Sequence, residues 1–299
     1  MFHPRLRLLR RGRHGLIHLN LMSKPAKSQW DFGGLIIFLS LSLLAAEGRA
    51  ESWRLIWSDE FNGPAGTGID TNKWTAETGG NGWGNREWEF YTASPRNAAL
   101  ASNGCLEIVA LKLPAHTFDA SYGEGEYSSA RLVTGKKFLV KYGRIEARIR
   151  IPAGQGLWSA FWMLGEDNAM GWPRCGEVDI MENVGKEPDT VLGSLHGPGY
   201  SGHNSLNTAF HLKNKERFAD NFHVFAVEWE ENEIRWYVDG QLYERRTPAN
   251  LPAGEKWVFN KPFSLLLNLA VGGKWPGYPD QTTRFPAVMA VDYVRVYQR

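Results

Sequence analysis

Short β-strand patterns recur along almost the whole chain and leave little room for helices. Residues 144–150 and 292–297 alternate polar and apolar side chains, which is typical of strands with one buried face. Residues 263–269 are almost continuously apolar, which suits a strand buried on both faces. An Asp-Gly pair at residues 239–240 separates two further strand patterns and predicts a tight hairpin. Because such patterns extend over roughly 250 residues, the sequence predicts an all-β protein, a β-sandwich of the jelly-roll type.

The N-terminal 50 residues do not share this pattern. Residues 35–46 (LIIFLSLSLLAA) are apolar, and Gly48 and Ala50 stand where a signal peptidase recognises small residues. This apolar run is shorter than the ~20 residues that a membrane-spanning helix needs. We therefore expect residues 1–50 to be a secretory signal peptide with an upstream extension, and residues 51–299 to form a single domain that is extracellular or periplasmic.

The basic character of the chain is confined to this N-terminal segment. Residues 1–50 contain eight Lys and Arg and two acids, which leaves 26 basic and 30 acidic side chains in residues 51–299. The resulting formal charge of −4 gives no support to a nucleic-acid-binding surface. We expect the mature chain to be a monomer that binds neither nucleic acid nor membrane.

Cysteine is scarce, with Cys105 and Cys175 alone in the sequence. One pair in a domain of this size is not a disulfide scaffold, and we expect two buried free thiols. No CxxC or HExxH metal-binding motif is present.

Three acids are concentrated in residues 175–185 (CGEVDIMENVG). In a regular strand Glu177 and Asp179 point to one face and Glu182 to the other, because side chains alternate. A β-bulge at residues 180–181 would return Glu182 to the face of the other two acids. Carboxylates this close disfavour one another's ionisation, so at least one should have a raised pKa.

Such a cluster suits hydrolysis of a glycosidic bond with retention of configuration, in which two carboxyls lie ~5–5.5 Å apart. One carboxyl attacks the anomeric carbon, and the other protonates the departing oxygen and later activates water. The alternative is a strand whose acids simply face solvent. Apolar residues between the acids and several tryptophans just before them favour a site.

The segment GEVDIMEN (residues 176–183) resembles the active-site signature of glycoside hydrolase family 16 in its bulged, laminarinase-like form. Further matches in chain order are WSDEFNG (57–63), GWGNRE (82–87), YGRIEAR (142–148), GLWSAFWM (156–163), HGPG (196–199), LNLAVGG (267–273) and DYVRVY (292–297). The resemblance implies a jelly roll with an open substrate cleft on its concave sheet, so that residues 51–299 are a catalytic domain. It also implies that Glu177 is the nucleophile, Asp179 its assistant and Glu182 the acid/base.

The resemblance also suggests which residues bind sugar. Trp158 and Trp162 are four apart, which places them on one face of a strand, and together with Trp172 they are expected to stack on sugar rings. Trp172 would lie next to the reacting sugar, and His196 would hydrogen-bond a sugar hydroxyl. The remaining expected cleft positions are Asn85, Glu87, Asn268 and Trp275.

No cofactor for catalysis is implied. Family members often bind a structural Ca²⁺ away from the catalytic face, and hard oxygen ligands suit this ion. The matching positions in this sequence are Glu60, the backbone of Gly104, and Asp292.

The sequence thus predicts a secreted retaining endo-β-1,3-glucanase that hydrolyses laminarin-type glucan by double displacement. The preference for the 1,3 linkage depends mainly on Met181, the residue of the bulged signature that resembles laminarinases. A mixed-linkage β-1,3-1,4-glucanase is therefore the nearest alternative. Agarase- or carrageenase-like activity is a more distant alternative. A non-catalytic glucan-binding module is a different class of function, and such modules usually lack the glutamates that this chain has.

Overall fold

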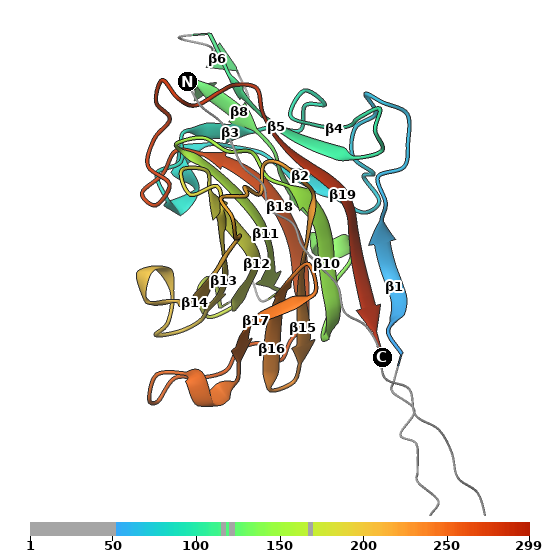
Figure 1. The fold of residues 1–299 in the computed structure, drawn as a ribbon, viewed down its shortest axis with the longest axis vertical. Helices are drawn as coiled ribbons and strands as arrows, with labels where there is room; N and C mark the ends of the chain where they lie inside the picture. Colours follow the sequence, from blue (N-terminus) through green and yellow to red (C-terminus); the bar gives the residue numbers. More distant parts are fainter. Residues whose placement is uncertain (1–51, 115–117, 120–122, 167–169) are drawn as a thin grey trace, which may run out of the picture. The chain divides into compact units, whose positions relative to one another are not determined.

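Two large β-sheets pack face to face in the computed structural model, which describes residues 52–114, 118–119, 123–166 and 170–299 (Figure 1). The expected signal peptide falls on residues 1–50 and lies outside the described part. Helix is limited, among the described residues, to four 3₁₀ turns: η1 (Asn81–Gly84), η2 (Gly135–Lys137), η3 (Gly202–Asn204) and η4 (Pro248–Asn250). None of the helical segments in these ranges is long and apolar enough to cross a membrane. The prediction of an all-β sandwich is confirmed.

The larger sheet has ten strands. In spatial order they are β17 (Gln241–Arg246), β16 (Glu233–Val238), β15 (His223–Glu230), β10 (Gly143–Arg150), β19 (Ala287–Gln298), β5 (Leu106–Lys112), β8 (Tyr127–Ser129) and β3 (Glu89–Tyr91), with β1 (Arg54–Asp59) on β19 and β4 (Ala98–Leu100) on β5. The seven-stranded sheet consists of β14 (Leu206–His211), β13 (Thr190–His196), β12 (Glu177–Val184), β11 (Leu157–Gly165), β18 (Phe263–Val271), β9 (Arg131–Val133) and β2 (Thr75–Glu77). A small separate sheet pairs β6 (Phe118–Asp119) with β7 (Gly123–Glu124).

The strand patterns of the sequence reappear as expected. All nine residues of β18 are buried, in agreement with its continuous apolar run. The hairpin between β16 and β17 turns at Asp239 and Gly240, whose φ values of 49° and 78° are both positive, as a type I′ turn requires. Cys105 and Cys175 are both buried and are not joined in a disulfide, as expected.

The seven-stranded sheet has an apolar inner face and a mixed outer face. Phe161 and Met163 of β11 belong to the main core between the sheets. Ala160 and Trp162 alternate with them and form a small separate cluster with Leu266 of β18 on the outer face. Side chains that pair with Ala160 or Trp162 across the strands therefore also lie on the outer face.

The predicted bulge is present in β12. Met181 pairs with Phe161, but the next residue of β11, Trp162, pairs with Asp179, so that Ile180 is the extra residue. Glu182 pairs with Ala160, two positions from Trp162, and the two acids consequently share the outer face. Both bulge residues, Ile180 and Met181, are buried in the core.

A tryptophan from the opposite sheet supports the bulge. The indole of Trp236 on β16 crosses the core and donates its Nε1 hydrogen to the backbone carbonyl of Asp179 at 2.8 Å. On β13, the strand next to β12, a Cβ atom added at Gly193 would lie 2.5 Å from this indole. Glycine at this position leaves the space that the ring needs. The carbonyl freed from regular pairing is thus satisfied inside the core.

This contact predicts an unequal response of two tryptophans to the same change. Trp236→Phe leaves a buried carbonyl unpaired and should lower the free energy of unfolding by about 1–3 kcal/mol. Trp257→Phe is the matched control, because its indole donates to the carbonyl of Glu231 at 3.0 Å in an exposed setting where water can replace it. Denaturant unfolding measures both variants, and equal losses would contradict the supporting role of Trp236.

Candidate active site

Glu177 and Glu182, the first and last acids of the cluster in chain order, each accept a hydrogen bond from a tryptophan. The indole Nε1 of Trp172 donates to Glu177 Oε2 at 2.9 Å, and that of Trp158 donates to Glu182 Oε1 at 3.1 Å. Trp172 is 54% exposed, which leaves much of its ring available for an apolar ligand face. The two indoles fix the carboxyls and present flat surfaces beside them.

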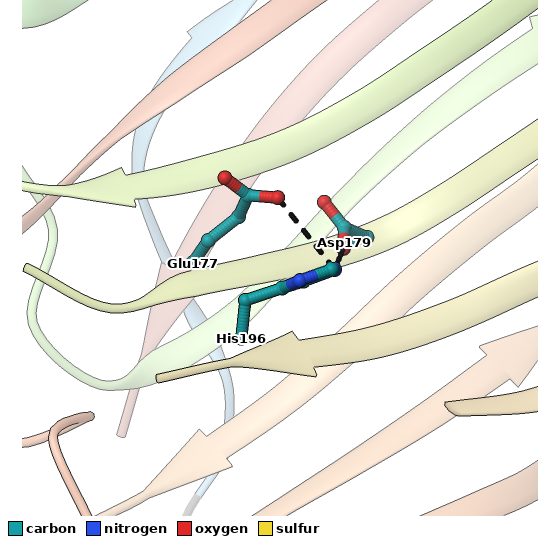
Figure 2. Close-up of side chains that lie close together, drawn as sticks. All are labelled: Glu177, Asp179 and His196. Atoms are coloured by element: carbon teal, nitrogen blue, oxygen red, sulfur yellow. Dashed lines mark ion pairs between the residues drawn. The ribbon is translucent and has the colours of Figure 1, made fainter. Parts of the chain in front are cut away.

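The central acid, Asp179, is paired with histidine. Figure 2 shows the imidazole of His196 converging with the carboxyls of Glu177 and Asp179. Its Nε2 lies 2.9 Å from Asp179 Oδ2 and 3.7 Å from Glu177 Oε1. The other ring nitrogen, Nδ1, accepts the backbone N–H of Gly202 at 3.1 Å. The neutral imidazole therefore carries its hydrogen on Nε2 and directs it at the acids.

Two carboxyls and an imidazole also suggest a metal site, since one donor atom from each of Glu177, Asp179 and His196 lies within 4.8 Å of the others. A metal ion would need the lone pair of Nε2. That lone pair becomes free only if the hydrogen moves to Nδ1, where the Gly202 N–H already points. The arrangement fits hydrogen bonding among the acids better than it fits a bound ion.

The three acids share a high affinity for protons. Burial, reinforced by the charge of Asp179, raises the pKa of Glu177 to about 8. Burial likewise raises the pKa of Asp179 to about 8 and the pKa of Glu182 well above its usual range. Because each charge disfavours the next, the cluster keeps at least one proton at neutral pH. A proton donor and an ionised carboxylate can thus coexist on one face.

A chain of hydrogen bonds begins at Trp162, the residue that pairs with Asp179 across the strands. The indole of Trp162 donates to Asn268 Oδ1 at 2.7 Å, and the Asn268 amide donates to the Tyr91 hydroxyl at 3.1 Å. Tyr91 donates to Glu87 Oε2 at 3.2 Å, and Asn85 donates to Glu87 Oε1 at 2.9 Å. The structure therefore joins four of the expected cleft residues into one network through a tyrosine that sequence analysis missed.

Three further contacts involve aromatic rings of this region. Trp275 packs edge-on against Trp158, with ring centroids 5.2 Å apart. The guanidinium of Arg131 lies 4.7 Å from the ring of Trp162 and 4.9 Å from that of Trp83. Sequence analysis missed Arg131 and Trp83. Trp83 had a signal, since it lies within the matched segment 82–87. Arg131 comes beside Asn268 through the pairing of β9 with β18, which is long-range.

Comparison with known proteins settles the family. A family model described as glycosyl hydrolases family 16 matches residues 67–295. The chain belongs to glycosyl hydrolase family 16. It is 40% identical over 283 residues to a β-glucanase from Rhodothermus marinus, covering 88% of this chain and 92% of that one.

Solved family 16 structures agree closely with this fold. The laminarinase catalytic domain from Thermotoga maritima has a TM-score of 0.77 and 49% identity, covering 83% of this chain and 99% of that one. The endo-β-1,3-glucanase from Pyrococcus furiosus has a TM-score of 0.77 and 48% identity, covering 82% and 94%.

The residues expected to bind calcium in this family 16 chain have other partners. Both carboxylate oxygens of Glu60 accept from the guanidinium of Arg295, at 2.9 and 2.7 Å, and Asp292 Oδ2 accepts from Arg148 at 2.7 Å. Each of these acids is thus already paired with an arginine. Calcium binding at Glu60, Gly104 and Asp292 stays a prediction of the resemblance.

The raised pKa values make the acids a source of instability at neutral and higher pH. An acid whose folded pKa exceeds its unfolded pKa weakens the fold progressively as pH rises from the unfolded to the folded value. Asp179→Asn removes this penalty, and its melting temperature relative to the natural chain should increase from about pH 5 to about pH 8.

The exposed Asp220 provides the matched control, because Arg217 lowers its pKa and its titration ends below that range. Thermal melts of Asp220→Asn should show a difference from the natural chain that does not grow between these pH values. A pH-independent difference for Asp179→Asn as well would show that Asp179 has an ordinary pKa.

Proposed function

We propose that this chain is a secreted retaining endo-β-1,3-glucanase that acts on laminarin-type glucan. The observation that carries the proposal is the bulged β12, which presents Glu177, Asp179 and Glu182 on one face between tryptophans. The names of the Thermotoga maritima and Pyrococcus furiosus relatives, a laminarinase and an endo-β-1,3-glucanase, support the substrate class.

In the first step Glu177 acts as the nucleophile. Its ionised carboxylate oxygen forms a bond to the anomeric carbon while the bond from that carbon to the leaving sugar oxygen breaks. Glu182 transfers its proton to the departing oxygen, so that a hydroxyl is released. The hydrogen bond from Trp158 keeps the Glu182 carboxyl in place for this transfer.

In the second step water releases the sugar. Glu182, now ionised, removes a proton from water, whose oxygen bonds to the anomeric carbon as the ester bond to Glu177 breaks. Two inversions at one carbon give net retention. His196 orients Asp179. From this position Asp179 modulates the charge on the Glu177 carboxylate while Glu177 forms and then loses its bond to the anomeric carbon.

Linkage preference is the less constrained part of the proposal. Met181 in the bulge favours the 1,3-specific form by resemblance, whereas the name of the Rhodothermus marinus relative states no linkage. A mixed-linkage β-1,3-1,4-glucanase is therefore the second candidate. A non-catalytic glucan-binding module is disfavoured because it would have no need of three proton-sharing acids.

Substrate assays separate these candidates. We expect release of reducing ends to be fastest on laminarin, slower on lichenan, and negligible on agarose and carrageenan, with retained configuration in a proton NMR time course. Glu177→Gln is the control: the uncharged amide cannot act as the nucleophile, so turnover should fall by at least about 10³-fold while glucan still binds. Fastest hydrolysis of agarose, or an inverted product, would refute the proposal.

We further propose that the chain is exported and trimmed before it acts. This rests on the apolar run at residues 35–46 and the small residues at Gly48 and Ala50. The N-terminus of the protein recovered from the medium or periplasm of an expressing bacterium should be Glu51. Recovery of the full-length chain from the cytoplasm alone would contradict export.

A further inference from the structure

Glu89 is a buried acid that the proposed mechanism leaves unused. It is 1% exposed, and its Oε2 accepts the backbone N–H of Val271 at 2.6 Å. Within the described residues no hydrogen-bond donor reaches its Oε1 and no basic side chain pairs with it. An ionised carboxylate with a single donor and no cation is costly to bury.

A second acid, Glu87, lies within reach of the Glu89 side chain. A hydrogen bond between two carboxyls requires one of them to be protonated. Both oxygens of Glu87 already accept, from the amide of Asn85 and the hydroxyl of Tyr91. Glu87 is thus surrounded by donors, as suits a carboxylate, and Glu89 is not.

The charged surroundings support the same assignment. Burial raises the pKa of Glu87, and the charge of Arg131, which is also paired with Glu77 on β2, acts against this rise together with the hydrogen bonds to Glu87. Burial and the charge of Glu87 raise the pKa of Glu89 well above its usual range. Tyr91 completes the set of titratable groups around the pair.

We propose that Glu89 is a positioning residue whose protonated carboxyl donates a hydrogen bond to Glu87 and keeps Glu87 ionised for binding sugar hydroxyls. Glu87 is connected through Tyr91 and Asn268 to Trp162 on the outer face, so its orientation is transmitted along that network. The ligand named here rests on the proposed function, whereas the protonation of Glu89 does not.

The inference predicts that a neutral donor suffices at position 89. In Glu89→Gln the amide oxygen can accept from Val271 while the amide N–H donates to Glu87, so kcat/KM on laminarin should stay within about twofold. Glu89→Leu removes a hydrogen bond to a charged group and should raise KM about tenfold or more with a smaller change in kcat. Equal impairment of both variants would overturn the positioning role.

Protonation is tested without any activity measurement. Because the pKa of Glu89 is raised in the folded state, Glu89 makes the natural chain lose stability as pH rises above ordinary glutamate values, and Glu89→Gln lacks this contribution. The melting temperature of Glu89→Gln relative to the natural chain should therefore increase as pH rises above the ordinary pKa of glutamate. An infrared difference spectrum of the two proteins at neutral pH should show the carbonyl stretch of one protonated carboxyl.

Glu146→Gln is the matched control, since Glu146 is also buried but is paired with Arg144 at 2.8 Å. It should leave the protonated-carboxyl band unchanged. A missing band for Glu89, together with a melting difference that does not depend on pH, would overturn the inference. If the chain hydrolyses no glucan, the proposed function fails while these two readouts still decide the state of Glu89.

Discussion

The bulge in β12 is the constraint on which the arrangement of the acids depends. One extra residue in a strand reverses the direction of every following side chain, so Glu182 joins Asp179 on the outer face only because Ile180 is inserted between them. The insertion frees the carbonyl of Asp179 from regular pairing, and Trp236 of the opposite sheet satisfies it across the core. The ten-stranded sheet, through Trp236, thus fixes the local geometry of β12 in the seven-stranded sheet.

The same geometry has a cost in stability. Three carboxyls close together and largely shielded from water raise one another's pKa values, and the fold tolerates this because indoles, an imidazole and buried backbone hold each group in place. Glu87 and Glu89 repeat the pattern on the neighbouring part of the face, where one proton again serves two acids. Proton sharing between buried acids supplies both the chemistry and, in our proposal, the positioning of a sugar-binding carboxylate.

Local patterns in the sequence were sufficient for the strands at residues 144–150, 263–269 and 292–297, for the β16–β17 hairpin and for the bulge. Each of these depends on residues close together in the chain. Local patterns were not sufficient for contacts that form between distant strands. Trp236 is separated from Asp179 by 57 positions, and Arg131 approaches Asn268 only through the β9–β18 pairing. The hydrogen bonds from Arg295 to Glu60 and from Arg148 to Asp292 were missed for the same reason. Glu89 had a local signal, because a second acid, Glu87, lies two positions before it in the sequence. Glu87 was already among the expected cleft residues.

Chemical trapping of the nucleophile tests the central claim most directly. A laminarin-type oligosaccharide glycoside with fluorine at C2 and a good leaving group forms the glycosyl ester but slows its hydrolysis, so that mass spectrometry of a protease digest locates the labelled residue. We predict one sugar adduct, carried by the peptide with residues 176–183 and attached to Glu177. An adduct on Glu182, or turnover that leaves no adduct and inverts the anomeric carbon, would contradict the roles assigned to the three acids.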